Sequence, residues 1–155
     1  MVQRLVLSEV APNDDDELVA WFPDASALRA FAGDTLSWPL TREQLQALRA
    51  DPRNHAWTAW TTGRRVGHAE LVRIDDDRGL LARVAVAPGQ RGQGFGTALL
   101  GAMIEQARSL DLSRLELNVY ADNRSAVQLY RAAGFEEQAP SAGRPNVLRM
   151  TRSLG

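Results

Sequence analysis

The pattern of apolar and polar residues predicts strands in the middle of the chain, followed by a helix and a further strand. Apolar-rich runs separated by short turns predict three antiparallel strands, at residues 55–61, 65–74 and 80–87. Apolar residues recurring every three or four positions predict a helix over 98–108. A strand at 114–120 follows. Because a helix joins it to the preceding strand, those two strands should be parallel.

The N-terminal third should hold one strand and three short helices. Residues 4–10 form the strand, and Asn13, Asp24 and Thr41 are each placed to cap the start of a helix. The first helix would begin with three aspartates at 14–16. We expect these carboxylates to be solvated, since the helix dipole favours negative charge at that end.

The C-terminal part should hold one more helix and a closing hairpin. Asn123 can cap a helix that runs to Ala133, and Gly134 follows where helices commonly end on glycine. Two short runs, 135–139 and 147–152, predict the hairpin. The sequence therefore predicts an α/β fold, with an α+β mixed sheet that is mostly antiparallel, one parallel pair and flanking helices. All 155 residues should form a single domain.

Composition excludes several classes of function. The net charge of −1 gives no basic field for nucleic acid or an anionic membrane, so we expect neither as a partner. The chain has no cysteine and two histidines, which argues against thiolate chemistry and against a metal site. No run is long and apolar enough for a membrane helix, and no signal-peptide pattern is present. We therefore expect a cytoplasmic protein.

A glycine-rich turn precedes the helix at 98–108. Gly92, Gly94 and Gly96 stand at alternate positions after Arg91. Glycine allows a tight turn and leaves room for a ligand, and the first N–H groups of a helix have no partner within it. The positive end of the helix dipole adds to this, so the turn is suited to bind phosphate. The chain has no lysine, which excludes a Walker loop and a protein kinase.

The turn fits the pattern Q/R-x-x-G-x-G/A and resembles the acyl-CoA loop of the GNAT superfamily of N-acetyltransferases. A second family pattern is a strand, an asparagine and a helix ending in L-Y-x-x-x-G-F. The stretch from Asn118 to Phe135 matches it. Both patterns occur in the right order and at the right separation. The resemblance covers about residues 66 to 136.

The resemblance implies transfer of an acyl group, usually acetyl, from coenzyme A to an amine, with acetyl-CoA as co-substrate. The pantetheine arm would pair with an exposed strand edge, where a backbone N–H would polarise the thioester carbonyl. The residues expected to bind the cofactor are Val84, Ala85, Val86, Arg91, Gly92, Gln93, Gly94, Phe95, Gly96, Thr97 and Asn123.

Three residues are candidates for acid–base catalysis. Tyr130 in the second pattern would protonate the leaving thiolate as a general acid. The attacking amine must be neutral, and Glu70 or Glu116 could remove its proton directly or through water. Catalysis without a protein base is as open as catalysis by either glutamate, and His68 is a further candidate base. Aromatic residues at 21–38 would either wall the acceptor cleft or belong to the core.

The acceptor itself cannot be named from the sequence. It is an amine, either on a small molecule or at a peptide end, and the protein would be a monomer or a homodimer. Attack would be direct, since no cysteine is present to form an acyl-enzyme. Two alternatives stay open: a catalytically silent acyl-CoA-binding sensor, and a transferase that uses another acyl-CoA.

Overall fold

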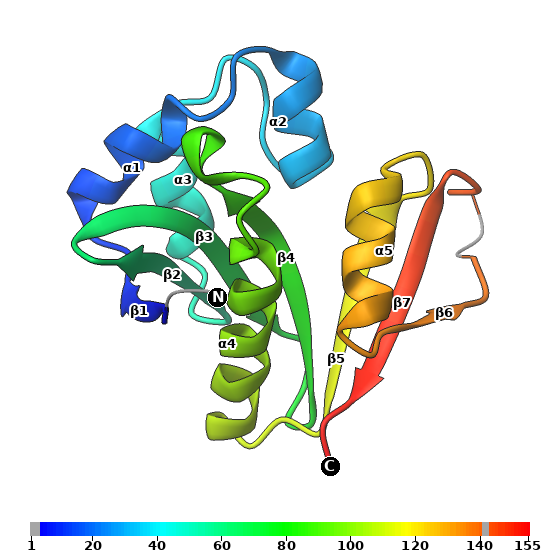
Figure 1. The fold of residues 1–155 in the computed structure, drawn as a ribbon. Helices are drawn as coiled ribbons and strands as arrows, with labels where there is room; N and C mark the ends of the chain where they lie inside the picture. The colour runs from blue at the N-terminus through cyan, green and yellow to red at the C-terminus, as the bar shows by residue number, and fades with distance from the viewer. Residues whose placement is uncertain (1–3, 141–142) are drawn as a thin grey trace.

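The computed structural model describes residues 4–140 and 143–155, and within them it forms one sheet with helices on both faces (Figure 1). The strands are β1 (Val6–Glu9), β2 (Asn54–Thr61), β3 (Arg64–Arg73), β4 (Arg78–Val86), β5 (Arg114–Tyr120), β6 (Glu136–Gln138) and β7 (Val147–Ser153). The helices are α1 (Pro12–Val19), α2 (Ala25–Ala32), α3 (Arg42–Arg49), α4 (Phe95–Ser109) and α5 (Arg124–Ala132), with a 3-10 turn at Pro88–Gln90.

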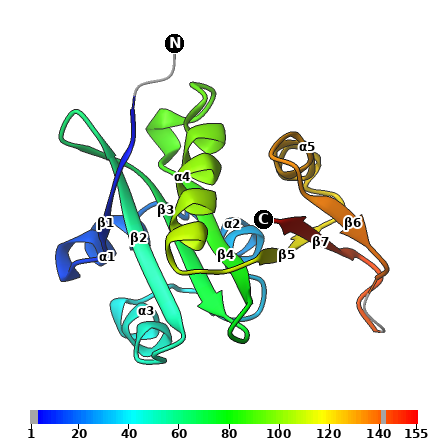
Figure 2. The ribbon, with the colours of Figure 1, turned by 90° about the horizontal axis from the view of Figure 1, so that it is seen from below.

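The strand order is β1-β2-β3-β4-β5-β7-β6. Neighbouring strands are antiparallel except β4 and β5, which are parallel. This confirms the predicted mixed sheet with one parallel pair. Helices α4 and α5 lie on one side of the sheet, and α3 lies on the other, where it packs on β2 (Figure 2).

Strands β4 and β5 pair along only three residues and then separate. The paired residues of β4 are Arg78, Gly79 and Leu80. Further along β4, its register with β3 shifts between His68 and Glu70, and Arg83 has a φ of +48°. This is a β-bulge, and a bulge bends the strand that carries it. The upper half of β4 therefore diverges from β5 (Figure 1).

Two apolar clusters hold the helices in place. Side chains of α4, among them Leu99, Leu100 and Met103, are buried against the sheet. A second cluster joins the N-terminal helices through residues such as Leu28 and Leu45. Within the described part of the chain, no helix is long and apolar enough to cross a membrane.

The prediction of a solvated start to the first helix is wrong. The helix begins at Pro12, whose fixed φ suits the first helical position, so Asn13 is inside it and not its cap. Asp14 and Asp15 are buried. Asp14 accepts hydrogen bonds from the backbone N–H of Ala11 at 2.8 Å and from Nε of Arg65 at 2.6 Å.

The buried aspartates of α1 are compensated by arginines from elsewhere in the chain. Asp15 is paired with Arg49 of α3, and Asp14 also accepts a hydrogen bond from the hydroxyl of Thr58 at 2.9 Å. Burial would raise the pKa of Asp14, but these hydrogen bonds and the charge of Arg65 hold that pKa below its ordinary value. Helix α1 is therefore anchored by charge as well as by apolar contact.

The other predicted helix caps are confirmed. The side chains of Asp24, Thr41 and Asn123 accept hydrogen bonds from N–H groups in the first turns of α2, α3 and α5. Helix α4 begins at Phe95, three residues earlier than the apolar spacing predicts. Its cap is Gly94, which adopts a left-handed conformation with a φ of 84°.

Candidate active site

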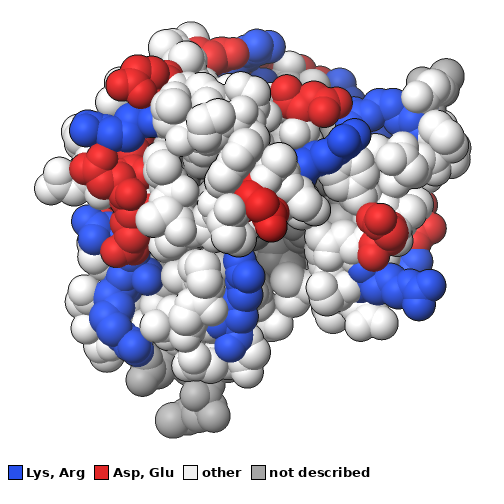
Figure 3. Space-filling model, turned by 90° about the horizontal axis from the view of Figure 1, so that it is seen from above, with Lys and Arg blue, Asp and Glu red and all other residues white. Residues whose placement is uncertain are grey.

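The space between the diverging strands is a continuous cleft made of two cavities. The larger is about 640 Å³ and lies beside the start of α4, and the smaller is about 300 Å³ and lies between β4 and β5. The residues that line both are Ala30, Phe31, Val84, Asn123, Ala126 and Tyr130. Seen from above, the surface has a hollow, and charged side chains of both signs surround this hollow (Figure 3).

The larger cavity gathers most of the residues predicted to bind the cofactor. These are Val84, Ala85, Val86, Arg91, Gly92, Gly94, Phe95, Gly96 and Asn123. Gln93 and Thr97 belong to the same loop and helix start but line neither cavity. Ser125 and Leu129 also line this cavity; neither was predicted to bind the cofactor, although Leu129 is the leucine of the L-Y-x-x-x-G-F pattern.

The glycines of the loop have separate structural reasons. Gly92 and Gly94 have φ values of 76° and 84°, which other residues rarely adopt. Gly96 is needed for packing, since a Cβ atom there would lie 3.1 Å from Cδ2 of Leu129. The unpaired N–H groups at the start of α4 therefore border a cavity from which side chains are kept clear.

The edge of β4 turns its backbone toward the cleft. The N–H of Ala87 donates to the carbonyl of Val66 on β3, at 2.9 Å. Since backbone groups alternate in direction along a strand, Val86 and Val84 direct theirs away from β3, where β5 no longer pairs. Nε of Arg91 lies 3.4 Å from the carbonyl oxygen of Val86 and ties the loop to this edge.

Tyr130 stands where the two cavities meet. Its ring makes an edge contact with Phe135, with centroids 6.0 Å apart. Burial raises the pKa of the Tyr130 hydroxyl to about 12, so the group is neutral and keeps its proton at physiological pH. Asn123 serves twice, because it caps α5 through Ala126 and also lines both cavities.

Glu70 is buried behind the cleft and does not line either cavity. It accepts hydrogen bonds from Nε of Arg83 at 2.7 Å and from Asn54 at 3.1 Å, and its other oxygen lies 2.7 Å from Nε2 of His68. Burial would raise the pKa of Glu70, but His68 and Arg83 hold that pKa below its ordinary value. The geometry makes Glu70 an ionised partner of Arg83.

Glu116 also lies outside both cavities. It is buried and accepts a hydrogen bond from Arg78 at 2.9 Å, and Nε of Arg149 lies 3.8 Å from its other carboxylate oxygen. The structure therefore does not bring either glutamate to the cleft wall. Their assignment as catalytic bases stays a prediction.

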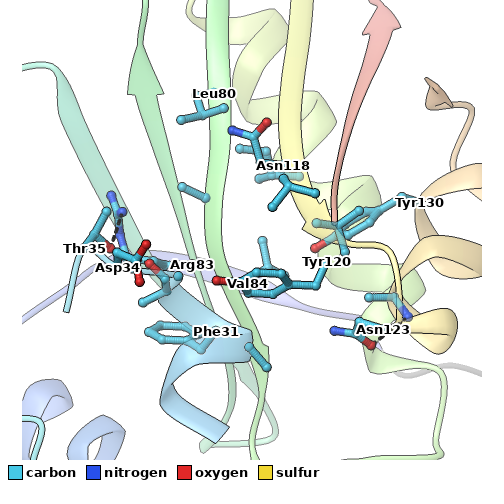
Figure 4. Close-up of a pocket in the computed structure, with 18 of the residues that line it drawn as sticks. Phe31, Asp34, Thr35, Leu80, Arg83, Val84, Asn118, Tyr120, Asn123 and Tyr130 are labelled. Atoms are coloured by element: carbon cyan, nitrogen blue, oxygen red, sulfur yellow. Dashed lines mark hydrogen bonds between the residues drawn. The ribbon is translucent and has the colours of Figure 1, made fainter. Parts of the chain in front are cut away.

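Within the described chain, the smaller cavity is lined by eight polar residues, of which the sequence patterns predicted only Asn123 and Tyr130. The polar members are Asp34, Thr35, Arg83, Asn118, Tyr120, Asn123, Tyr130 and Arg144. Asp34, Thr35 and Arg83 gather on one side, and the two tyrosines lie on the other (Figure 4). The six that were not predicted come from four separate segments: the loop after α2, β4, β5 and the loop before β7. Of these six, only Asn118, exposed between two buried apolar neighbours on β5, carried a local signal.

Three of the four aromatic residues of the N-terminal segment have one of the two expected roles, and Trp38 has neither. Phe31 lines both cavities and Phe22 lines the larger one. Trp21 is buried in the cluster of the N-terminal helices and Trp38 is exposed, and neither lines a cavity. Two of the four aromatic residues therefore reach the cleft.

Comparison with solved structures gives the same architecture. Spermidine N-acetyltransferase from Vibrio cholerae, in complex with CoA and spermine, superimposes with a TM-score of 0.80 at 20% sequence identity. The match covers 97% of this chain and 96% of that one. At this identity the likeness establishes the fold.

Sequence comparison identifies the family. The chain is 35% identical over 86 residues to an uncharacterized N-acetyltransferase of Mycobacterium bovis, covering 56% of this chain and 55% of that protein. It is 28% identical over 146 residues to the mycothiol acetyltransferase of Clavibacter michiganensis, covering 90% of this chain and 45% of that protein. The chain thus spans about half the length of these curated relatives. The model of the Acetyltransferase (GNAT) family matches residues 17–135, and the chain therefore belongs to that family.

Proposed function

We propose that this protein transfers an acetyl group from acetyl-CoA to an amine by direct attack. The observation that carries the proposal is the continuous cleft. It joins a backbone cradle at the start of α4 to a second, polar cavity, and Tyr130 lies at the junction. A protein that only binds acyl-CoA would need the first cavity but not the second.

Two features of the larger cavity suit it to bind the co-substrate. The helix start and its glycines offer N–H groups to a pyrophosphate, as helix N-termini do in other phosphate sites. The edge of β4 at Val84 and Val86 offers backbone groups to the amides of the pantetheine arm. Acetyl-CoA supplies the activated acetyl group, and the related Vibrio cholerae enzyme is itself described in complex with CoA.

The chain's own residues supply the remaining chemistry. A backbone N–H at Val84 or Val86 stabilises the negative oxygen that forms when the amine attacks. Tyr130 holds its proton near the departing sulfur and donates it or a hydrogen bond. Since the chain contains no cysteine, the amine attacks the thioester directly.

The amine must lose a proton before or during attack. For an amine with a pKa of about 10.4, deprotonation at pH 7 costs roughly 4 to 5 kcal/mol. Glu70 and Glu116 are our candidates to receive that proton, and both are held by arginines. Because neither lines the cleft, each would act through water; transfer to bulk water is the alternative.

The test is a screen of amine acceptors with acetyl-CoA, read as release of free thiol, with CoA affinity measured by calorimetry. We expect measurable CoA binding and acceptor-dependent thiol release. CoA binding with no turnover for any amine would favour a silent binding domain. Faster turnover with succinyl-CoA than with acetyl-CoA would mean that the preferred acyl donor is not acetyl-CoA.

A further inference from the structure

We infer that the acceptor amine also carries an anionic group, such as a carboxylate, and is not a polycation. The inference rests on the proposed function, because it concerns what enters the smaller cavity. Among the described residues, the charged side chains that line this cavity are Asp34, Arg83 and Arg144. One carboxylate and two guanidinium groups thus face an incoming acceptor.

Arg83 is fixed in position by its surroundings. It lies on the bulge of β4, its side chain is 8% exposed, and Nε donates to Glu70 at 2.7 Å. Nη1 lies 3.4 Å from the hydroxyl oxygen of Thr35, and Nη2 has no hydrogen-bond partner within residues 4–140 and 143–155. A guanidinium can bind a carboxylate through two parallel N–H groups, so an immobile Arg83 with a free edge is suited to an anion.

Arg144 adds a second cation whose charge is not compensated. It is exposed, precedes β7 and lines the same cavity. None of the ion pairs formed within the described part of the chain includes Arg144. Glu70 pairs with Nε of Arg83 from behind, so the free edge of Arg83, Arg144 and Asp34 are the charged groups that face the cavity.

This arrangement discriminates between classes of amine. An acceptor with one ammonium and one carboxylate meets both signs of charge, the ammonium near Asp34 and the carboxylate near Arg83 or Arg144. A polyamine meets two guanidinium groups and a single carboxylate, and like charges at close range disfavour binding. The Vibrio cholerae structure, by contrast, is of a complex with spermine. The shared fold therefore does not imply a shared acceptor.

The experiment compares acceptors that differ only in that anionic group. L-alanine, β-alanine and 4-aminobutyrate are each assayed beside their amides, with spermidine as the polycation. An alanine amide has the less basic amine, so intrinsic reactivity favours the amide. We expect at least one carboxylate acceptor to exceed its amide in kcat/KM by tenfold or more, and to exceed spermidine.

Variants of Arg83 and Arg144 test whether these arginines cause the preference for a carboxylate acceptor over its amide. Arg144→Gln should lower the carboxylate-to-amide ratio about threefold to fivefold, the upper range for an exposed ion pair. Arg114→Gln removes an exposed arginine at the far end of β5 and should leave the ratio unchanged. Glu70→Gln combined with Arg83→Gln keeps the buried charge balanced and should lower the ratio at least tenfold. Melting temperatures show whether each variant is folded.

The outcomes separate this inference from the proposed function. Amides or spermidine used as well as carboxylates, or a preference that survives Arg144→Gln and the double variant, would overturn the inference and leave acetyl transfer intact. Turnover of no amine by a protein that binds CoA would overturn both.

Discussion

Replacing Tyr130 by phenylalanine removes one oxygen from the junction of the two cavities and keeps the ring that contacts Phe135. The change therefore tests the hydroxyl with little effect on packing. If Tyr130 assists departure of the thiolate, kcat should fall, while CoA affinity and melting temperature should change little.

The size of the fall follows from the pKa of Tyr130. With the hydroxyl at about 12 and a thiol at about 8.5, complete proton transfer to the thiolate is uphill by roughly 5 kcal/mol. The hydroxyl is therefore better suited to donate a strong hydrogen bond to the developing negative sulfur. A hydrogen bond to a charged group contributes about 1.5–3 kcal/mol, which corresponds to a loss of about 10- to 150-fold in kcat.

The assay measures thiol release at saturating acceptor, beside CoA affinity by calorimetry. Tyr120→Phe is the comparison, because it removes the chain's other tyrosine hydroxyl, which accepts a hydrogen bond from Arg29 at 3.3 Å. It should act on the acceptor KM and keep kcat within about threefold, well short of the loss expected at Tyr130. A donor with a more acidic leaving thiol should shrink the Tyr130→Phe effect, since that thiolate needs less stabilisation.

Two results would refute this reasoning about Tyr130. An unchanged kcat would mean that water or another group stabilises the leaving sulfur, and Tyr130 would be a packing residue. A parallel fall in CoA affinity and kcat would mean that the hydroxyl binds the cofactor in its ground state.

Two further changes test the loop and the buried pair. Gly94→Val places a β-branched residue at a φ of 84° and should weaken CoA binding, measured by calorimetry, more than tenfold. Gly101→Val, on an open position of α4, is the control. Equal CoA affinities of the two variants would show that the loop before α4 does not bind the pyrophosphate. Glu70→Gln should lower the free energy of unfolding by about 3 kcal/mol at pH 7, the lower end for breaking a buried pair. The pKa of Glu70 in the folded protein is below its ordinary 4.5. The loss of unfolding free energy in Glu70→Gln should therefore be complete above pH 4.5 and should shrink as the pH falls through the folded pKa. Denaturant unfolding of both proteins, at about pH 7 and at a pH below 4.5, measures this change.

Most residues of the larger cavity could be predicted because the patterns that mark them are local. The glycines, Asn123 and Tyr130 each stand in a short pattern whose backbone requirements can be read directly from neighbouring residues. The parallel pair of β4 and β5 could be predicted similarly, since the two strands are joined by a crossover through α4. Local patterns also located three of the four proposed helix caps.

The charged residues could not be placed in this way. Asp14 and Glu70 look solvated in sequence, yet each is buried against an arginine that is distant along the chain or brought in by a bulge. Ion pairing of that kind depends on packing, because a buried carboxylate is tolerated only when a partner compensates it. The sequence contains both partners but not their distance.

The bulge at Arg83 lies between the backbone that lines the larger cavity and the charged side chains of the smaller one. It bends β4 away from β5, which opens the cleft and leaves Val84 and Val86 unpaired with β5, where we propose that the co-substrate binds. The same bulge turns Arg83 into the smaller cavity, where Glu70 fixes it. The backbone that we propose binds acetyl-CoA and the arginine that we propose selects the acceptor are therefore adjacent along a single strand. In this proposal, cofactor binding depends on backbone and glycine, and acceptor selection depends on charged side chains contributed by distant segments. Related chains can accordingly share the cofactor loop and differ in acceptor, and the charges of the smaller cavity are the place to look for that difference.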